Sequence, residues 1–595
     1  MPVAERSESF RTHTKESSFV SLLTGWAQQG VQSFFATQRI LLDLAMRQNA
    51  SIMHSVRQQL SDPHHSPTAL LGEVAGRASA QTKGACAAGR PLHPLRVALP
   101  LQGRRMSGAH DWLAAGSERV IETSCAWVFL QGERALKLKK PVDYGFLDFT
   151  TVDKRRWALE RELAFNRSAA PDIYRAVHRV TAGGDGLALD GPGETVDWVL
   201  EMRAFDPDDV LAEHPERVDG ALAERLGRRV ARFHADAAVR PDGGGVKALG
   251  FTIRTNAEHL VALKDQLGAA AVETVVAATD AAFEAAGPLL ERRRAEGFAR
   301  HCHGDLHLGN VLLEGDEPVL FDCIEFNDLL SEIDVLYDIA FLMMDLCFRG
   351  RGDAANRVLN AYLDEAARSF APALWDGLAA LPLFLSARAS VRAHVTATQH
   401  DLERGRAYLA AAAEHLRPPT PTLTAIGGLS GTGKTTLARM AAPRIGGAPG
   451  AVILRSDEIR KRLAGVAPTE RLPPEFYTSE RSTQVYGELQ ALAARVLAAG
   501  RSVVLDAVFL KPDERRSAED VAAGAGVPFR GAWLEGPAET LRGRLEARRG
   551  DASDAGPAIL AAQLASDPGP LDWRRFDAAD LDAAAEAIVA GTGWN

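Results

Sequence analysis

The stretch GGLSGTGKTT, residues 427–436, restricts the possible folds of this chain more than any other part of its sequence. The residues that match the pattern G-x-x-x-x-G-K-[S/T] are Gly428, Gly433, Lys434 and Thr435. The apolar run TLTAI precedes the pattern, and the helix-forming segment TTLARMAA follows it. A strand, a glycine-rich turn and a helix in this order form a phosphate-binding loop, or P-loop, because the backbone N–H groups of the turn meet at the N-terminus of the helix. The alternative, a glycine-rich turn without a ligand, does not account for the strand and the helix.

The residue types in this loop suit the binding of ATP. Lys434 would reach the β- and γ-phosphates, and the Thr435 hydroxyl would ligate Mg²⁺. A second metal contact is expected from an acidic residue at the end of a neighbouring strand, and Asp506 in SVVLDAVF is the candidate. Asp506 could alternatively cap the turn that follows it. The residues expected to contact the nucleotide are Gly428, Leu429, Ser430, Gly431, Thr432, Gly433, Lys434, Thr435 and Thr436.

The segment around the loop has the pattern of an α/β domain. A proline-rich break, LRPPTPT at residues 416–422, marks a domain boundary. Beyond it, the apolar runs LTAIGG, AVILRSD, SVVLDAVF and FRGAWLEG alternate with helical patterns, which is typical of a parallel sheet with crossover helices. We therefore predict an α/β P-loop NTPase domain with a parallel sheet over residues 421–595.

Charged residues in this segment predict how an acceptor would be handled. Asp457, at the end of AVILRSD, could accept the proton of an acceptor hydroxyl, and Arg460, one helical turn later, could hold an anionic group. The segment TLRGRLEARRGDASDAG would place arginines in a lid over the transferred phosphate, and a solvated basic helix face is the alternative. The arginines considered for the lid are Arg544, Arg548 and Arg549.

With these residues, the segment resembles the P-loop kinases of small molecules and polynucleotide ends, which include gluconate kinase, zeta toxin and chloramphenicol phosphotransferase. Those families use a carboxylate at the position of Asp457 as a base, and the resemblance implies the same role here. It does not identify the acceptor.

A second stretch rich in polar residues is HCHGDLHLGN, residues 301–310. The residues that could bind zinc in it are His301, Cys302, His303 and His307, but no second cluster of Cys or His follows at metal-ligand spacing. His303, Asp305 and Asn310 match the kinase catalytic-loop pattern H-x-D-x-x-x-x-N. Asp322, in FDCIEF, follows the strand-like run PVLF, where a kinase has its metal-binding aspartate. The spacing therefore favours a kinase loop over a zinc site.

Phosphoryl transfer gives each residue of this loop an expected role. Asp305 would orient or deprotonate the attacking hydroxyl, while Asn310 and Asp322 would hold Mg²⁺ ions that bridge the phosphates of ATP. His303 would be structural.

An earlier, strand-rich segment offers the expected phosphate-binding lysine. The run RALKLKK places Lys137 and Lys139 on the same face of a strand, and we prefer Lys137 as the group that holds the α- and β-phosphates. Its expected partner on the following helix is Glu162, with Glu160 as the second choice. The alternative for these groups is a surface ion pair.

HGDLHLGN and the following FDCIEFNDLLSEIDVLYDIAFLMMDL resemble the aminoglycoside phosphotransferase family of kinase-like enzymes, over about residues 107–415. The resemblance implies an α+β kinase-like fold, in which Asp338 is the structural aspartate after the metal site. The order of the two domains also resembles bacterial fusions of an aminoglycoside phosphotransferase with an ATP-binding domain. The chain departs from the kinase pattern near residues 121–135, where no G-x-G-x-x-G is present.

Charge and cysteine content exclude several other classes of protein. A net charge of -9 and a pI near 6.0 provide no basic field, so we expect no bulk nucleic-acid binding. The five cysteines lack C-x-x-C spacing, which favours a reducing compartment. No uncharged apolar run reaches the ~18 residues that span a bilayer, and the N-terminus lacks the apolar core of a signal peptide. We expect a cytoplasmic protein without a membrane span.

The N-terminal region precedes both domains. Within residues 1–60, apolar residues recur at three- and four-residue steps between Phe19 and Met46, which predicts an amphipathic helix. It could dock on the protein, mediate self-association, bind a partner or lie on a membrane surface. The helix resembles phasin-type granule-associated helices. Residues 61–106, rich in Ser, Pro, Gly, Ala and His, are expected to be a flexible linker.

These patterns together predict an ATP- and Mg²⁺-dependent phosphotransferase with two nucleotide-binding modules, each of which transfers the γ-phosphate to a hydroxyl of a small-molecule acceptor. In the alternative, the P-loop domain carries the chemistry and the kinase-like domain is a binding module with a regulatory role.

Overall fold

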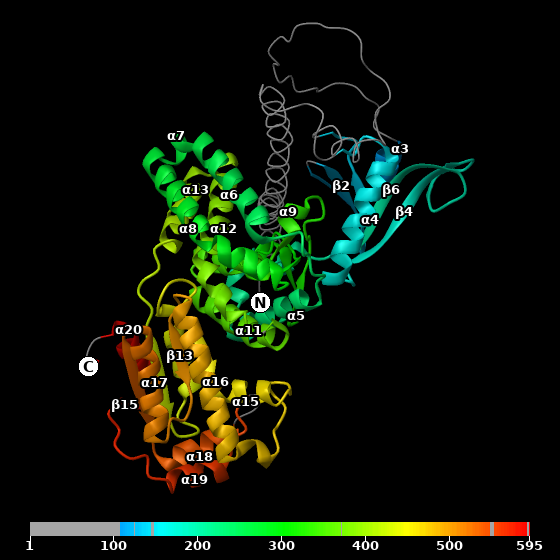
Figure 1. The fold of residues 1–595 in the computed structure, drawn as a ribbon. Coiled ribbons are helices and arrows are strands. Elements are labelled where there is room, and N and C mark those ends of the chain that lie inside the picture. Colours follow the sequence, from blue (N-terminus) through cyan, green and yellow to red (C-terminus); the bar gives the residue numbers. More distant parts are fainter. Residues whose placement is uncertain are drawn as a thin grey trace, which may run out of the picture. The chain divides into compact units, whose positions relative to one another are not determined.

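The computed structural model describes residues 108–123, 125–143, 148–370, 372–547, 552–591 and 594. The predicted N-terminal helix and linker lie outside these residues, as do Arg548 and Arg549. The described chain divides into two compact units (Figure 1). The strand-rich unit runs from Gly108 to Leu163 and includes Asp172–Ala204, and the large unit contains Ala164–Pro171 and Phe205–Asn595.

The strand-rich unit is built on one antiparallel sheet. Its six strands follow the order β1-β2-β3-β6-β4-β5. The elements are α3 (Gly108–Ala115), β1 (Arg119–Glu122), β2 (Ala126–Gln131), β3 (Arg134–Lys139), most of α4 (Val152–Ala169), β4 (Tyr174–Gly183), β5 (Gly186–Leu189) and β6 (Glu194–Arg203). Strand β3 is buried over most of its length, and its Leu136 and Leu138 pack in an apolar cluster with Phe129. Because side chains alternate along a strand, Lys137 and Lys139 lie together on the opposite face, as predicted.

The first part of the large unit, residues 205–415, is mostly helical and is called the helical part below. Its helices are α5 (Gly220–Asp236), α6 (Gly245–Ala262), α7 (Lys264–Leu267), α8 (Ala269–Ala295), α9 (Asp328–Ser331), α10 (Val335–Phe348), α11 (Gly352–Phe370), α12 (Leu381–Thr398) and α13 (Leu402–His415). Nearly every residue of α10 and α12 is buried, so these two helices lie at the centre of the core.

Two short antiparallel strand pairs in the helical part hold the stretch HCHGDLHLGN. Strand β7 (Ala299–His301) pairs with β10 (Glu332–Asp334), and β8 (Val311–Glu314) pairs with β9 (Glu317–Leu320). The stretch begins at the end of β7 and enters β8 after one 3-10 turn, Leu308–Asn310. Both of its ends are therefore fixed by backbone hydrogen bonds.

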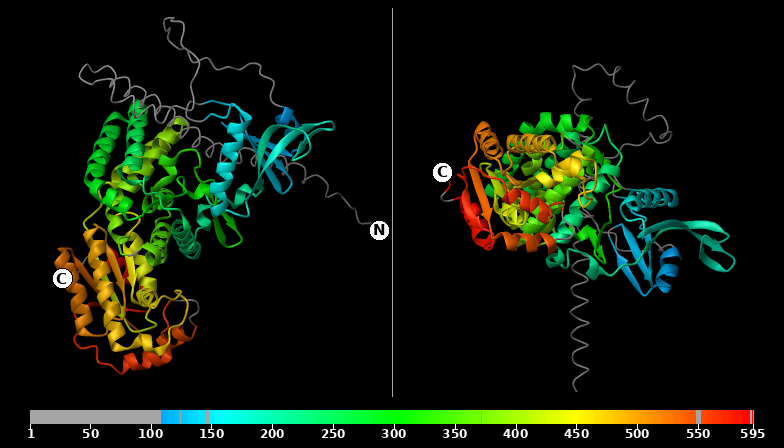
Figure 2. Two further views of the ribbon diagram at one scale, coloured as in Figure 1. Left: turned by 45° about the vertical axis from the view of Figure 1, so that its right-hand side comes forward. Right: turned by 90° about the horizontal axis from the view of Figure 1, so that it is seen from below.

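The second part of the large unit, residues 421–595, is called the P-loop part and contains a five-stranded parallel sheet in the order β12-β13-β11-β14-β15 (Figure 2, yellow to red). Its elements are β11 (Leu423–Gly428), α14 (Lys434–Ala441), β12 (Val452–Arg455), α15 (Ser456–Leu463), α16 (Ser479–Ala498), β13 (Val503–Asp506), α17 (Pro512–Ala525), β14 (Phe529–Glu535), α18 (Ala538–Ala547), α19 (Pro557–Leu564), β15 (Arg574–Asp577) and α20 (Leu581–Ala590). Helices α14 and α20 pack in one apolar cluster with the sheet, while α16 and α17 pack in another. The predicted parallel sheet with crossover helices is confirmed.

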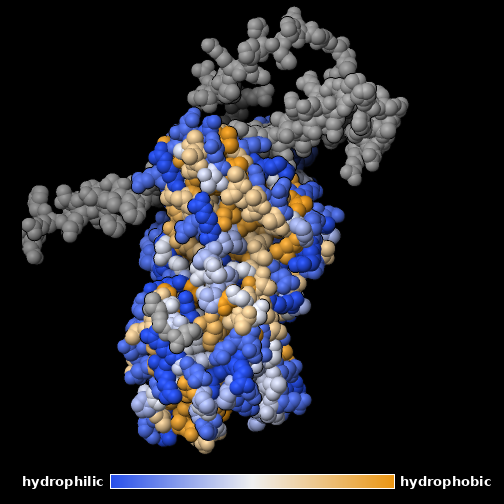
Figure 3. Space-filling model, turned by 60° about the vertical axis from the view of Figure 1, so that its left-hand side comes forward, coloured by the Kyte–Doolittle hydropathy of each residue, from blue (hydrophilic) through white to orange (hydrophobic). Residues whose placement is uncertain are grey.

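One face of the molecule can be followed in the space-filling view of Figure 3. On the face shown in Figure 3, hydrophilic residues predominate and hydrophobic residues are interspersed among them. Within the described ranges, every helix is too short or too polar to cross a bilayer.

Candidate functional site

Two glycines give the P-loop its shape between the end of β11 and the start of α14. Gly428 and Gly431 have φ values of 138° and 89°, which residues other than glycine rarely adopt. A Cβ atom at Gly428 would lie 2.6 Å from the carbonyl oxygen of Leu534, and one at Gly431 would lie 2.7 Å from that of Leu541. A larger residue at either position would therefore clash with backbone atoms of β14 or α18.

The ammonium group of Lys434 lies over this loop. Lys434 is the first residue of α14, and its Nζ donates hydrogen bonds to the carbonyl oxygens of Gly428 (2.9 Å) and Leu429 (3.1 Å). The loop is also held from α19, because the Ser430 N–H donates to Gln563 Oε1 at 2.8 Å. Thr436, the last residue of the predicted nucleotide contact, is exposed. The structure therefore places the lysine beside the helix N-terminus where phosphate oxygens bind in such loops.

Thr435 and Asp506, the two predicted magnesium ligands of the P-loop part, are in direct contact. The Thr435 hydroxyl donates to Asp506 Oδ2 at 2.6 Å. Strand β13 runs parallel to β11, with Asp506 paired with Ile426, so the carboxylate lies at the same edge of the sheet as the loop. Hydroxyl and carboxylate oxygens are ligands that Mg²⁺ prefers, so this donor set fits the metal.

Arg455 is a charged group that the sequence analysis missed at this position. It is buried at the end of β12, and its guanidinium donates to Asp506 Oδ2 (3.2 Å), Thr435 Oγ1 (3.3 Å) and Glu458 Oε1 (2.8 Å). The only signal in the sequence is an arginine at the end of an apolar run, two positions before Asp457. Arg455 therefore orients the two predicted metal ligands and adds a positive charge beside them.

Asp457 and Arg460, the predicted acceptor residues, lie one turn apart on α15. Burial raises the pKa of the Asp457 carboxyl above its usual value, and the guanidinium of Arg455 limits this rise. A carboxylate with a raised pKa is better suited to accept a proton. Arg460 donates one hydrogen bond to the carbonyl of Phe476 at 2.7 Å, whereas its buried Nε has no acceptor within the described residues.

Arg544, the described member of the predicted lid, contacts the backbone of the P-loop. Its guanidinium lies 3.4 Å from the carbonyl oxygen of Gly431 and 3.1 Å from that of Ala578. The arginine therefore links α18 to the phosphate-binding loop.

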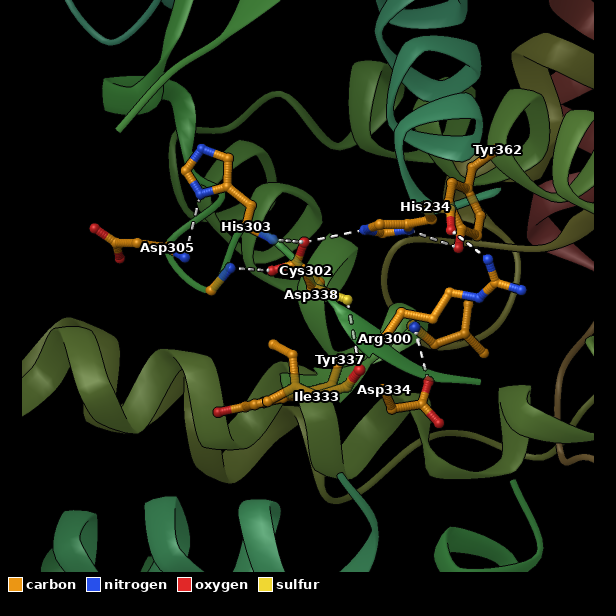
Figure 4. A network of polar contacts seen from close by, with 12 residues as sticks. His234, Arg300, Cys302, His303, Asp305, Ile333, Asp334, Tyr337, Asp338 and Tyr362 are labelled. Atoms are coloured by element: carbon orange, nitrogen blue, oxygen red, sulfur yellow. Dashed lines mark hydrogen bonds and ion pairs between the residues drawn. The ribbon is translucent and has the colours of Figure 1, made fainter. Parts of the chain in front are cut away.

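In the helical part, Asp338 fixes the backbone of the loop that begins at His301 (Figure 4). Its carboxylate accepts hydrogen bonds from the N–H groups of His303 (3.1 Å) and Gly304 (2.8 Å), and it also contacts the ring of His234 at 3.0 Å. Gly304 has a φ of 84°, and a Cβ atom there would lie 2.8 Å from the carbonyl oxygen of Leu330. Asp338 therefore contributes to the loop by holding its backbone.

Asp305 and Asn310, separated by five residues in the sequence, lie side by side. The Asn310 amide donates to the main-chain oxygen of Asp305 at 2.8 Å and to its Oδ2 at 3.2 Å. Burial alone would raise the pKa of Asp305, but the neighbouring His307 ring outweighs this effect and the pKa falls to about 2. The Oδ1 atom of Asn310 is buried and has no hydrogen-bond donor among the described residues. A buried amide oxygen without a donor is a suitable ligand for Mg²⁺, which fits the role predicted for Asn310.

Asp322, the third predicted residue of this site, follows β9 in an unusual backbone conformation. Its φ of 61° lies in the left-handed region, which few non-glycine residues adopt. The backbone of the next residue, Cys323, is held by Asn166, whose Oδ1 accepts from the Cys323 N–H at 2.7 Å. No local pattern in the sequence marks Asn166, because it lies more than a hundred positions before the residue it contacts.

Two histidines considered as zinc ligands have other contacts. His303 is buried, its ring Nε2 lies 2.9 Å from the carbonyl oxygen of Phe321, and burial lowers its pKa. Since a carbonyl only accepts, this nitrogen carries the proton and donates. His307 Nδ1 accepts from the N–H of Gly309 at 3.0 Å. His303 thus has the structural role predicted for it.

In the strand-rich unit, both candidate lysines contact Glu162. Lys137 Nζ hydrogen-bonds to Glu162 Oε1, and Lys139 Nζ lies 2.6 Å from Glu162 Oε2. Burial alone would raise the pKa of Glu162, but the two ammonium groups lower it to about 2. Glu160 is exposed and pairs with Arg156 at 2.8 Å, so the structure agrees with Glu162 as the partner of the lysines.

We predict that Glu162→Gln destabilises the strand-rich unit by about 3–5 kcal/mol, because it leaves two buried ammonium groups without their counter-charge. Since the pKa of Glu162 is lowered from 4.5 to about 2, the wild-type pair stabilises the fold fully above pH 4.5 and loses this effect as the pH falls towards 2. The measurement is hydrogen exchange in β3 and α4 between pH 3 and 7. The control is Glu160→Gln on the same helix, which should cost about 0.5 kcal/mol or less. Equal effects of the two variants would contradict the prediction.

Comparison with known proteins also finds a phosphotransferase domain followed by a P-loop domain. Residues 158–381 match the family described as "Phosphotransferase enzyme family", and residues 423–568 match the family described as "AAA domain". The uncharacterized protein Rv2004c of Mycobacterium tuberculosis is 31% identical over 474 residues, which cover 76% of this chain and 90% of that protein. The uncharacterized protein Mb2027c of Mycobacterium bovis gives the same values.

Two solved structures are similar to parts of the chain. The ADP-bound aminoglycoside phosphotransferase APH(2'')-Ib covers 52% of this chain and 98% of its own at 14% identity, with a TM-score of 0.28. A sugar kinase from Janibacter sp. HTCC2649 covers 30% of this chain and 94% of its own at 24% identity, with a TM-score of 0.22. These likenesses are partial, whereas the mycobacterial proteins match along both domains. The chain therefore belongs to the family of these mycobacterial proteins, and it joins a domain of the phosphotransferase enzyme family to a P-loop domain of the AAA type.

Proposed function

We propose that the protein transfers the γ-phosphate of ATP to hydroxyl groups of small molecules at two sites, one in the phosphotransferase-family domain and one in the P-loop domain. Two kinase-type domains support a phosphotransferase, and the alcohol acceptor is our inference from the site residues. The observation that carries the proposal is that each domain has a carboxylate near an oxygen ligand suited to Mg²⁺. Asp305 lies beside Asn310, and Asp506, which contacts Thr435, is near enough to Asp457 to raise its pKa.

In the helical part, Asp305 would bind the acceptor hydroxyl and take its proton as the bond to phosphorus forms. With a pKa of about 2, the carboxylate is ionised at all physiological pH values, so its main role is to orient the hydroxyl. Asn310 and Asp322 would hold Mg²⁺, which neutralises charge on the phosphate oxygens when bound. In the strand-rich unit, Lys137 and Lys139 are the proposed ligands of the α- and β-phosphates, and Glu162 restricts both side chains.

In the P-loop domain, Lys434 and the backbone of the loop would bind the β- and γ-phosphates. Thr435 and Asp506 would hold Mg²⁺ and are kept in orientation by Arg455. Asp457 would accept the proton of the acceptor. The Nε–H of Arg460, which has no acceptor among the described residues, would bind an anionic group of the acceptor.

The phosphotransferase-family domain has a second candidate function, which is to bind a ligand without catalysis. The feature that favours it is the lack of a G-x-G-x-x-G pattern near residues 121–135. Between β1 and β2, the Thr123 hydroxyl accepts from the Ala126 N–H at 2.8 Å. The pairing of Asp305 with Asn310 supports catalysis, and so we place the binding module second.

The test is phosphate transfer from γ-labelled ATP into a fractionated pool of metabolites. The intact protein is compared with Asp305→Ala, Lys434→Ala and the double variant, and Asp316→Ala and Lys247→Ala serve as exposed controls of the same residue types. We expect each single variant to abolish a different labelled product, or a different step towards one product. If only Lys434→Ala has an effect, the first domain is the binding module.

A further inference from the structure

We propose that helix α11 of the helical part is a docking surface for the edge strand of the P-loop sheet, and that Asn356 and Asn360 on it position the catalytic end of β12. The positioning role rests on the proposed function of the P-loop domain, whereas the docking itself does not. Helix α11 and the P-loop part belong to the same compact unit.

The first observation concerns hydrogen bonds at the edge of the sheet. Strand β12 is an edge strand that pairs with β13 on one side, so half of its backbone groups point away from the sheet. On that open side, the Ala451 carbonyl accepts from Asn356 Nδ2 (3.0 Å) and Asn360 Nδ2 (3.3 Å). The Ile453 N–H donates to Asn360 Oδ1 at 2.6 Å. Two asparagine side chains therefore replace the missing neighbouring strand.

The second observation is that one stripe of α11 makes all of these contacts. Asn356, Asn360, Asp364 and Arg368 follow at four-residue steps, which places them along one face of the helix. Arg368 donates to the carbonyl of Val466 at 2.7 Å, after the end of α15. The stripe therefore extends from β12 past the whole of α15, which carries Asp457 and Arg460.

Asp364 contributes less to this docking than the asparagines. It lies 3.8 Å from Arg462, but burial and the nearby Glu458 raise its pKa to about 7. A carboxyl group that is partly neutral near pH 7 forms a weak ion pair. The neutral amide groups of Asn356 and Asn360 are therefore the main polar contacts of the surface with β12.

A further contact joins the two parts on the neighbouring helix α5. Glu224 lies 2.9 Å from Arg357 of α11 and 2.7 Å from Arg439 of α14. Since α14 carries the P-loop lysine at its start, the helical part contacts both the phosphate-binding helix and the strand that leads to Asp457.

The position of β12 matters because the residues at its end act in the proposed reaction. Arg455 ends the strand and Asp457 lies in the first turn after it, whereas the phosphate loop follows β11. A displacement of β12 would therefore move the base and Arg455 but leave the loop and Lys434 in place. Small displacements of a positioned catalytic group reduce turnover strongly.

The test uses the full chain with Asn356→Ala, Asn360→Ala and both together. Glu365→Ala is the control, because Glu365 lies on α11 but pairs with Arg232 of the helical part. The first readout is hydrogen exchange of the peptide that covers residues 451–455. We expect about tenfold or faster exchange in the asparagine variants and no change in the control, with β13 protected in all proteins. Unchanged exchange in β12 would overturn the docking.

The second readout separates positioning from stability. In an Asp305→Ala background, we expect Asn360→Ala to lower the Lys434-dependent turnover of ATP about tenfold, while the affinity for a fluorescent ATP analogue stays within about twofold. Equal turnover in Asn360→Ala and the Glu365→Ala control would overturn the positioning role. A wild-type protein without any Lys434-dependent turnover would overturn the proposed function instead, and the exchange measurement would still decide the docking.

Discussion

Replacing Asp305 by asparagine should lower the phosphate transfer of the phosphotransferase-family domain by a factor of about 10²–10⁴, the usual contribution of a positioned acid–base group. Asparagine keeps the size of the side chain but removes the negative charge that attracts and orients the acceptor hydroxyl. Asn310, which donates to both the main chain and the carboxylate of Asp305, should keep the loop in its present shape. The measurement is the initial rate of label transfer from γ-labelled ATP, with Asp316→Asn as the exposed control.

The pH dependence of this activity gives a second check on Asp305. Its pKa of about 2 lies below its usual value, so the carboxylate stays ionised down to low pH and should cause no fall in kcat/KM between pH 5 and 8.

Transfer by Asp305→Asn above one tenth of the wild-type rate would contradict the role assigned to Asp305.

Replacing Lys434 by methionine should reduce the turnover of ATP in the P-loop domain by a factor of about 10²–10³, the usual effect of removing one preorganised hydrogen-bond donor from a developing negative charge. The ammonium group already lies within 3.1 Å of two loop carbonyls, so it needs no large movement to reach a bound phosphate. Methionine has a similar length and preserves the packing of α14. Turnover is measured in the Asp305→Asn background, with Lys247→Met as the control. A variant with more than half of the original turnover would exclude Lys434 from the reaction.

Local patterns in the sequence predicted those parts of the structure that depend on neighbours along the chain. The P-loop follows from the glycines, because backbone clashes at Gly428 and Gly431 exclude other residues. The pairing of Asp305 with Asn310 follows from a fixed spacing within one loop. The alternation of side chains along a strand predicted that Lys137 and Lys139 lie on one face. It did not show which of them would bind phosphate, and in the structure both contact Glu162.

Motifs predicted two contacts between segments far apart in the sequence, Lys137 with Glu162 and Thr435 with Asp506, but other distant contacts have no such signal. Arg455 lies at the end of an apolar run, where its sequence neighbours give no sign that it contacts Thr435 and Asp506. Asn360 gives no signal either. A polar residue on an amphipathic helix usually indicates the side that faces solvent, but Asn360 accepts a hydrogen bond from Ile453, which lies 93 positions later. Such contacts depend on which surfaces of the helical and P-loop parts meet, and this is a property of the folded chain.

We propose that one chain carries two nucleotide sites, one in each domain. The most direct measurement is the stoichiometry of binding of a non-hydrolysable ATP analogue with Mg²⁺ to the full-length protein, by equilibrium dialysis. We predict two equivalents for the wild-type protein, one for Lys434→Ala, and one for the double variant Asn310→Ala/Asp322→Ala. A single equivalent in the wild-type protein, lost completely in one of these variants, would contradict the account.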